Sequence, residues 1–356
     1  MAPGRVLGGD PAMRPAIRIG ILLALVAAAR AGASEFLQEM GAIADEAAAN
    51  GASVLRGRDG WLFFAPELRS LGVGAFWGAR AATVSRAPKP EYADPLPAIV
   101  DFHAQLAGAG IELVFVPVPA KAVIYPEAVA RTPNGDALQD RPDARHAEFY
   151  DLLRERGVRV LDLTPIFRAH RRESEGRLYC LQDTHWSGLA CEIVAAEIAN
   201  GIQEAGWVAD VPRRPFETKP LSVRITGDLW TALGETSLDK ESLQLKRIAP
   251  RTPEPTGWAN NEWRESPVLL LGDSHCLVFH SGGDMHARGA GLADHLAASL
   301  GFPPDVVGVR GSGATPSRLA LLRRRDNLAG KRVVVWCLSV REFTEGQGWR
   351  KVPVIR

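Results

Sequence analysis

The sequence is poor in cysteine and carries almost no net charge. Four cysteines stand among 356 residues and none belongs to a CxxC pair, which argues against a structural zinc site. The 42 Lys and Arg residues against 41 Asp and Glu give a formal charge of +1, so the chain lacks the basic excess of nucleic-acid-binding proteins. There is no internal repeat, and a hydrophobic content of 46% is that of a globular protein with a large core.

Long hydrophobic runs are also scarce, apart from one near the N-terminus. Ile19 to Ala29 is apolar and follows basic residues and an alternative start at Met13, while Ala-Gly-Ala at positions 31–33 offers a signal-peptidase site. The run is about half the length of a membrane-spanning helix. We therefore predict that residues 1–33 are a signal peptide and that the protein is periplasmic, with an uncleaved inner-membrane anchor as the alternative.

If the chain is exported, its cysteines can be oxidised to disulfides. Cys180 and Cys191 are close in sequence and could pair in an oxidising compartment. Cys276 and Cys337 lie in apolar, strand-like segments, where we expect buried thiols.

From residue 97 onward, short apolar runs alternate with helical patterns. Strands are expected at residues 112–118, 158–163, 267–271, 305–309 and 332–338, and helices at 97–108, 144–156, 188–205, 291–300 and 316–328. This alternation predicts an α/β fold with a mostly parallel sheet covered on both faces. We expect a single domain over residues 34–356, with an irregular insertion around 206–265.

One apolar strand ends in Gly272-Asp273-Ser274-His275. Ligands of open α/β sheets bind beyond the carboxyl ends of the strands, so a hydroxyl there would face the crevice. The amide of Ser274 could also stabilise an oxyanion. The alternative is a serine that only caps the next element.

A second polar cluster, Asp183-Thr184-His185-Trp186, precedes the helix predicted from residue 188. A serine nucleophile needs a base, which His185 can supply, and Asp183 can hold the imidazole in the required tautomer. The alternative is a capping Asp183 or Ser187 with His185 on the surface.

Two further strand ends carry polar or flexible residues. Gly311, Ser312 and Gly313 follow the strand predicted at 305–309, and their amides could complete an oxyanion hole or simply form a turn. Lys121 follows the strand at 112–118 and could position substrate or be solvated.

These stretches together resemble a known family, the SGNH-hydrolase-like acetyltransferases of exopolysaccharide modification of the AlgJ/AlgX alginate type. The resemblance covers most of the chain, in the family's order, through the motifs at residues 57–64, 116–126, 183–186, 272–275, 311–315 and 335–343. The Asp-x-His block precedes the Gly-Asp-Ser block, which is the circularly permuted order of this family. The family often has Glu after the last strand's Trp, but here Cys337 follows Trp336.

The resemblance implies a three-layer α/β/α SGNH fold and an exported O-acetyltransferase or acetylesterase that needs no cofactor or metal. Ser274 matches the nucleophile, His185 the base and Asp183 the orienting acid. The 311–313 loop matches the oxyanion region, and Lys121 and Trp186 are candidate substrate contacts. The implied partners are a polysaccharide substrate and a membrane-bound O-acyltransferase that supplies acetyl; no nucleic acid is implied.

Two other functions stay open at this point. A metal-dependent hydrolase could use Asp183, His185 and His275, with Asp273 as a further ligand. A polysaccharide-binding or assembly protein without turnover could stack sugars on aromatic side chains, for which the candidates are Trp61, Trp77, Trp186, Trp258 and Trp263.

Overall fold

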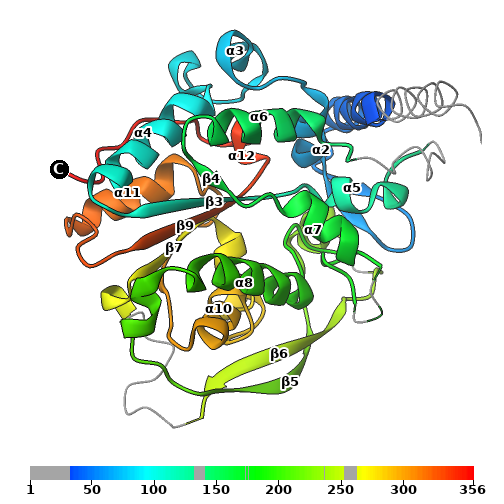
Figure 1. Cartoon of the computed structure of the whole chain (residues 1–356). Coiled ribbons are helices and arrows are strands. Elements are labelled where there is room, and N and C mark those ends of the chain that lie inside the picture. Colours follow the sequence, from blue (N-terminus) through cyan, green and yellow to red (C-terminus); the bar gives the residue numbers. More distant parts are fainter. Residues whose placement is uncertain (1–32, 132–140, 173, 175, 236, 252–262) are drawn as a thin grey trace, which may run out of the picture.

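The computed structural model describes residues 33–356 except 132–140, 173, 175, 236 and 252–262 (Figure 1). The predicted signal peptide thus lies outside the described residues, apart from residue 33; residues 33–49 are helical. Within the described ranges, no helix is both long enough and apolar enough to cross a membrane.

Five parallel strands form the central sheet, in the order β4-β3-β9-β7-β8. Their bounds are β3 (Glu112–Val118), β4 (Arg159–Val160), β7 (Val268–Gly272), β8 (Asp305–Gly308) and β9 (Val333–Ser339). Every residue of β7 and β9 is buried, as expected for strands covered on both faces. Pro117 interrupts the apolar run of β3 but pairs only with β9, because β4 has already ended, so no hydrogen bond to β4 is lost there.

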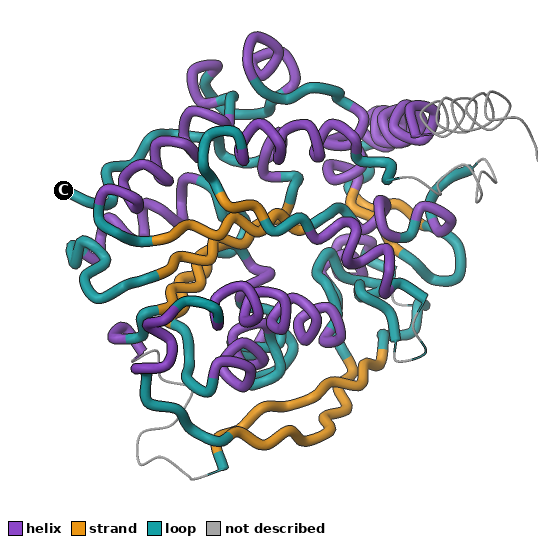
Figure 2. The backbone as a smooth tube through the Cα atoms, viewed as in Figure 1, coloured by secondary structure: helices purple, strands orange, loops and turns teal. Residues whose placement is uncertain are grey.

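Helices cover both faces of this sheet (Figures 1 and 2). On one face lie α4 (Pro95–Gly108), α6 (Ala144–Arg154) and α11 (Thr315–Arg324), and on the other lie α8 (Gly188–Gln203) and α10 (Leu292–Leu300). The predicted α/β/α fold with a parallel sheet is confirmed.

Smaller elements surround the sheet. An N-terminal hairpin pairs β1 (Val54–Arg56) with β2 (Leu62–Phe64), and Asp59 and Gly60, both with positive φ, lie in the turn between them. The remaining helices are α2 (Ala65–Gly72), α3 (Ala81–Val84), α5 (Lys121–Ile124), α7 (Leu163–His170), α9 (Asp228–Leu233) and α12 (Glu342–Glu345).

Two segments differ from the prediction. The strand expected at 158–163 is reduced to β4, because Asp162 accepts a hydrogen bond from the Thr164 N–H at 3.1 Å and starts α7. The insertion at 206–265 is not irregular throughout: β5 (Phe216–Arg224) and β6 (Ser242–Pro250) form an antiparallel hairpin with α9 between them. This hairpin is largely exposed and polar, so its apolar periodicity is weak.

All four cysteines are buried free thiols. The expectation for Cys276 and Cys337 is therefore confirmed, whereas a Cys180–Cys191 disulfide is absent. Cys191 lies in α8, and the Cys180 thiol instead approaches the Trp186 carbonyl oxygen at 3.6 Å. Burial raises the pKa of the Cys180, Cys191 and Cys337 thiols, which keeps them protonated and unreactive.

Candidate active site

The turn that carries Ser274 is fixed from several sides. A Cβ on Gly272 would lie 1.7 Å from the Cys337 carbonyl oxygen, so only glycine fits where β7 meets β9. The Asp273 carboxylate accepts hydrogen bonds from the His275 and Ser339 N–H groups, both at 2.8 Å. Ser274 then begins a short 3-10 turn at the carboxyl end of β7, the end at which open α/β sheets bind their ligands.

Asp183 and His185 come from the loop before α8. Asp183 Oδ1 accepts hydrogen bonds from the His185 N–H at 3.0 Å and from His185 Nδ1 at 2.5 Å. The Ser187 hydroxyl accepts from the Ala190 N–H and caps α8, which anchors the end of the loop. The Asp-x-His spacing thus lets one carboxylate bind both the backbone and the ring of the same histidine.

The fold brings this loop against the serine. His185 Nε2 lies 2.7 Å from Ser274 Oγ, and all three side chains are buried. Burial alone would raise the pKa of Asp183, but the imidazoles of His185 and His286 hold it well below its ordinary value. Burial alone would lower the pKa of His185, but the Asp183 carboxylate raises it. The arrangement is a hydrogen-bonded relay from carboxylate to imidazole to hydroxyl.

A second histidine binds the same carboxylate. His286 Nε2 lies 2.9 Å from Asp183 Oδ2, which also accepts a hydrogen bond from the Asp228 N–H at 2.9 Å. His286 adopts φ +70°, uncommon for a non-glycine residue. No local motif in the sequence marks His286 or Asp228 as partners of Asp183, because they stand 103 and 45 positions away from it.

Lys121 is buried beneath the Asp183 loop and does not line the surface around Ser274. Its side chain is 1% exposed, and Nζ donates to the carbonyl oxygens of Asp183 at 2.6 Å and Leu62 at 3.0 Å. Burial lowers the pKa of Lys121, and the nearby Glu67 carboxylate opposes that effect. The lysine therefore ties β2 to the Asp183 loop, and these surroundings give no support to the substrate contact that we expected.

The glycine loop after β8 does lie beside the serine turn. A Cβ on Gly313 would lie 2.8 Å from both the Asp273 amide nitrogen and the Leu338 Cβ, so glycine is required for this close approach. The Ser312 hydroxyl is committed to Glu342 Oε2 at 2.7 Å, and burial raises the pKa of Glu342 to about 7. The Ser312 hydroxyl is therefore already used, and the groups of this loop that a ligand could contact are its backbone N–H groups.

Trp186 is fully buried and stands edge-on to His275, with ring centres 5.1 Å apart. Trp186 therefore packs beneath the surface against His275, and its ring has no exposed face on which a sugar could stack. Trp61 is likewise buried, and Trp258 lies outside the described residues. Trp77 and Trp263 are half-buried, and both rings already have partners: Phe149 lies 5.5 Å from Trp77 between ring centres, and the Arg214 guanidinium carbon lies 4.6 Å from the centre of the Trp263 ring.

Arg341, which follows β9, is a further residue that the sequence did not single out. Its Nη1 lies 3.7 Å from Glu67 Oε1, and its guanidinium carbon lies 5.6 Å from the centre of the Phe64 ring. Nη1 is buried and makes no hydrogen bond within the described part of the chain. Because β9 pairs with β7, this guanidinium lies at the same end of the sheet as Ser274.

The four residues considered as metal ligands do not form one cluster, because Asp273 and His275 lie outside the group that contains Asp183 and His185. Among the described residues, only Asp183, His185 and Asp228 bring potential ligand atoms within 4.8 Å of one another. Both Asp228 oxygens accept hydrogen bonds from Thr184, and His275 Nδ1 is paired with Asp273 Oδ1 at 2.9 Å. These groups are arranged as hydrogen-bond partners, which suits the serine relay better than a metal-ligand shell.

Comparison with known proteins finds curated relatives for part of this chain. Proteins named "Probable alginate O-acetylase AlgJ" are 29% identical over 205 residues in Pseudomonas aeruginosa and 23% identical over 236 residues in Pseudomonas putida. Those matches cover 56% and 64% of this chain and 46% and 56% of the relatives, so the chain spans about half the length of the curated relatives it matches.

The same likeness appears in solved structures. The O-acetyltransferase domain of Pseudomonas putida AlgJ superposes with a TM-score of 0.59 at 22% identity, over 82% of this chain and 92% of that domain. Pseudomonas aeruginosa AlgX gives 0.57 at 17% identity, over 85% of this chain and 65% of AlgX. The model of the SGNH hydrolase-like domain of acetyltransferase AlgX matches residues 54–340. With the relay and the fold in place, this chain belongs to the AlgX family of SGNH hydrolase-like domains.

Proposed function

We propose that this protein is an O-acetyltransferase of exopolysaccharide modification that works through an acetyl-serine on Ser274. The observation that carries the proposal is the 2.7 Å contact between His185 Nε2 and Ser274 Oγ, with Asp183 on the other ring nitrogen. A hydroxyl paired with an oriented imidazole is the arrangement that acyl transfer requires. The names of the relatives support acetyl as the acyl group and alginate as a candidate polymer.

In the first half-reaction, His185 Nε2 takes the proton from Ser274 Oγ as the oxygen attacks the acetyl carbonyl carbon. The Asp183 carboxylate stabilises the imidazolium that forms. The tetrahedral intermediate then collapses, the donor's leaving oxygen receives the proton from His185, and acetyl remains esterified to Ser274.

Negative charge on the former carbonyl oxygen needs donors that are already in place. The N–H of Ser274 opens the 3-10 turn and has no acceptor within that turn. The backbone of the 311–313 loop lies beside it through Gly313. We assign the oxyanion hole to these amides, and each such donor contributes on the order of 100-fold to 1000-fold in rate.

In the second half-reaction, a sugar hydroxyl of the polymer gives its proton to His185 Nε2 and attacks the acetyl-serine carbonyl. The imidazolium returns the proton to Ser274 Oγ as the ester bond breaks, which regenerates the free serine. If water attacks instead, the enzyme acts as an acetylesterase.

The cellular setting forms part of the proposal. The apolar run before the Ala-Gly-Ala site supports export to the periplasm, since it has the length of a signal-peptide core. The acetyl group would then arrive from a membrane-bound O-acyltransferase, as the family resemblance implies, and leave on the exported polymer.

The proposal is tested by looking for the covalent acetyl-enzyme. Purified protein is mixed with a chromogenic acetyl ester, and intact-mass and peptide spectrometry search for one added acetyl group on Ser274. We expect the adduct in the native protein and none in Ser274→Ala, with chromophore release reduced at least about 1000-fold. Ester cleavage by Ser274→Ala at the native rate would overturn the proposal.

A further inference from the structure

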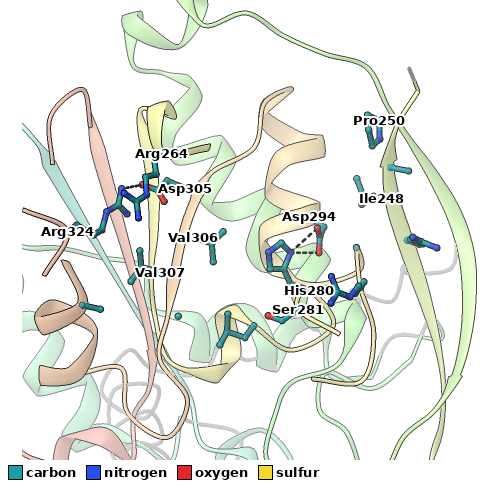
Figure 3. A pocket seen from close by; sticks show the side chains of 17 residues that line it. Ile248, Pro250, Arg264, His280, Ser281, Asp294, Asp305, Val306, Val307 and Arg324 are labelled. Atoms are coloured by element: carbon teal, nitrogen blue, oxygen red, sulfur yellow. Dashed lines mark hydrogen bonds and ion pairs between the residues drawn. The ribbon is translucent and has the colours of Figure 1, made fainter. Parts of the chain in front are cut away.

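A cavity of about 770 Å³ lies at the edge of the sheet beside β8 (Figure 3). Its walls come from β8, α10, α11 and β6, together with the loop that follows Ser274. The volume is within the range of ligand-binding pockets. None of Ser274, His185 and Asp183 lines it, so it is separate from the relay.

The cavity is basic. Its lining includes four arginines and two aspartates, which leaves a formal charge of +2. Both aspartates are already paired: Asp305 with Arg324 at 2.7 Å, and Asp294 with His280 at 3.0 Å (Figure 3). The remaining arginines have no carboxylate within ion-pair distance among the residues that the structure describes; they are Arg247, Arg264 and Arg288. Three guanidinium groups are thus available to an anionic ligand.

The arginines stand on two walls. Arg247 lies on β6, and the next residue, Ile248, donates its N–H to the Gly289 carbonyl oxygen at 2.7 Å. That hydrogen bond places Arg288 beside β6. Arg264 lies on the opposite side of the cavity, near Arg324 and Asp305 (Figure 3). Cationic groups on separate walls suit a ligand that carries several anionic groups along its length better than one small anion.

Apolar side chains line the space between these walls. Val306 and Val307 of β8, Leu277 and Ile248 contribute methyl groups to the lining. A sugar ring has apolar C–H edges and polar substituents, so it can pack on such a surface while its carboxylate reaches a guanidinium. Arginine binds carboxylates in a bidentate, planar geometry, which gives both energy and orientation.

The cavity also connects to the serine turn. The Leu277 N–H donates to the Ser274 carbonyl oxygen at 2.9 Å, and the Leu277 side chain lines the cavity. We infer that this cavity binds a segment of a uronic-acid-bearing polysaccharide and holds the polymer next to Ser274. That the ligand is a polymer rests on the proposed function. That the polymer carries carboxylates rests on the arrangement of the arginines.

Binding to the full chain in the Ser274→Ala background tests this without turnover. The probe is a linear oligomer of six uronic-acid residues, titrated by calorimetry at low and at high salt, beside a neutral hexasaccharide. We expect binding of the acidic oligomer that weakens at high salt, and little binding of the neutral one.

Variants locate the site. Arg247→Gln with Arg288→Gln should weaken binding about tenfold to 100-fold, and Arg264→Gln on the opposite wall about tenfold. Arg323→Gln, an exposed arginine of α11 outside the cavity, is the matched control and should bind as the parent does. Such losses, with Arg323→Gln unaffected, would support the inference.

Three results would overturn it: no binding of the acidic oligomer, equal binding of the neutral one, or full competition by inorganic phosphate, which would mark a small-anion site. Because Ser274 is absent from these measurements, none of those results bears on acetyl transfer. Conversely, a missing acetyl-serine in the native protein would refute the proposed function and leave measured oligouronate binding intact.

Discussion

His286 Nε2 lies 2.9 Å from Asp183 Oδ2, so one buried carboxylate carries two imidazoles. His185 occupies Oδ1, and His286 with the Asp228 N–H occupies Oδ2. Asp183 is thereby held in one orientation from both oxygens. The hydrogen bond of His286 goes to Asp183 and not to Ser274, so we regard His286 as a positioning residue.

Replacing His286 by Gln should therefore lower kcat about threefold to 30-fold with little change in KM. The loosened Asp183 would stabilise the His185 imidazolium less, so the acidic limb of the kcat/KM profile should move to lower pH. Rates on an acetyl ester measured across pH would check this. His103→Gln, on α4, is the control for a general histidine loss. A profile of unchanged shape with only lower thermal stability would mean that His286 is merely structural.

Asp183→Asn should lower kcat about 1000-fold to 10000-fold, because the amide no longer holds the imidazole in the proton-accepting tautomer. Residues that act as one relay are not additive. The double variant with Ser274→Ala should thus be no slower than Ser274→Ala alone. An additive loss in this double-mutant cycle would show that the two residues act separately.

Activity should rise with pH through a midpoint above 6.5, since only the neutral His185 ring can accept the serine proton. Burial would lower the pKa of His185, but Asp183 outweighs burial and raises it above its ordinary 6.5. The midpoint can be read from kcat/KM with a neutral acetyl ester. A midpoint clearly below 6.5 would be inconsistent with the Asp183 contact.

The same pair makes stability depend on pH. Asp183 has a lowered pKa, so its contribution is present above 3.8 and is lost as pH falls. His185 has a raised pKa, so its contribution is present below 6.5 and is lost as pH rises through the folded-state value. The difference in unfolding free energy between the native protein and Asp183→Asn should therefore peak between pH 3.8 and 6.5. Urea titrations at several pH values measure it, and a difference that does not vary with pH would contradict the coupling.

Lys121→Met should lower the free energy of unfolding by about 2–4 kcal/mol, because buried carbonyl groups lose a charged donor. Activity should fall as well, since one of those carbonyls belongs to Asp183. Lys351→Met, at an exposed lysine, should change neither property. Wild-type stability with a raised KM in Lys121→Met would instead favour the substrate role first expected from the sequence.

Much of this fold could be read from the chain. The apolar runs of β3, β7, β8 and β9 marked the sheet, because strands buried on both faces leave no polar alternation. The Gly272–His275 turn and the Asp183–His185 spacing were also visible, since each depends on neighbours within a few positions. The family motifs then associated the two loops.

Other features depended on contacts that no local pattern encodes. His185 meets Ser274 although they are 89 positions apart in the sequence, and His286 meets Asp183 although they are 103 positions apart. Lys121 and Trp186 have side chains typical of substrate contacts, yet tertiary packing buried both. Sequence by itself determined which segments must be buried and which turns are tight, because those follow from nearest-neighbour sterics and hydrophobicity. Only the tertiary structure decided which polar groups face one another, because that depends on how distant loops close over the sheet edge.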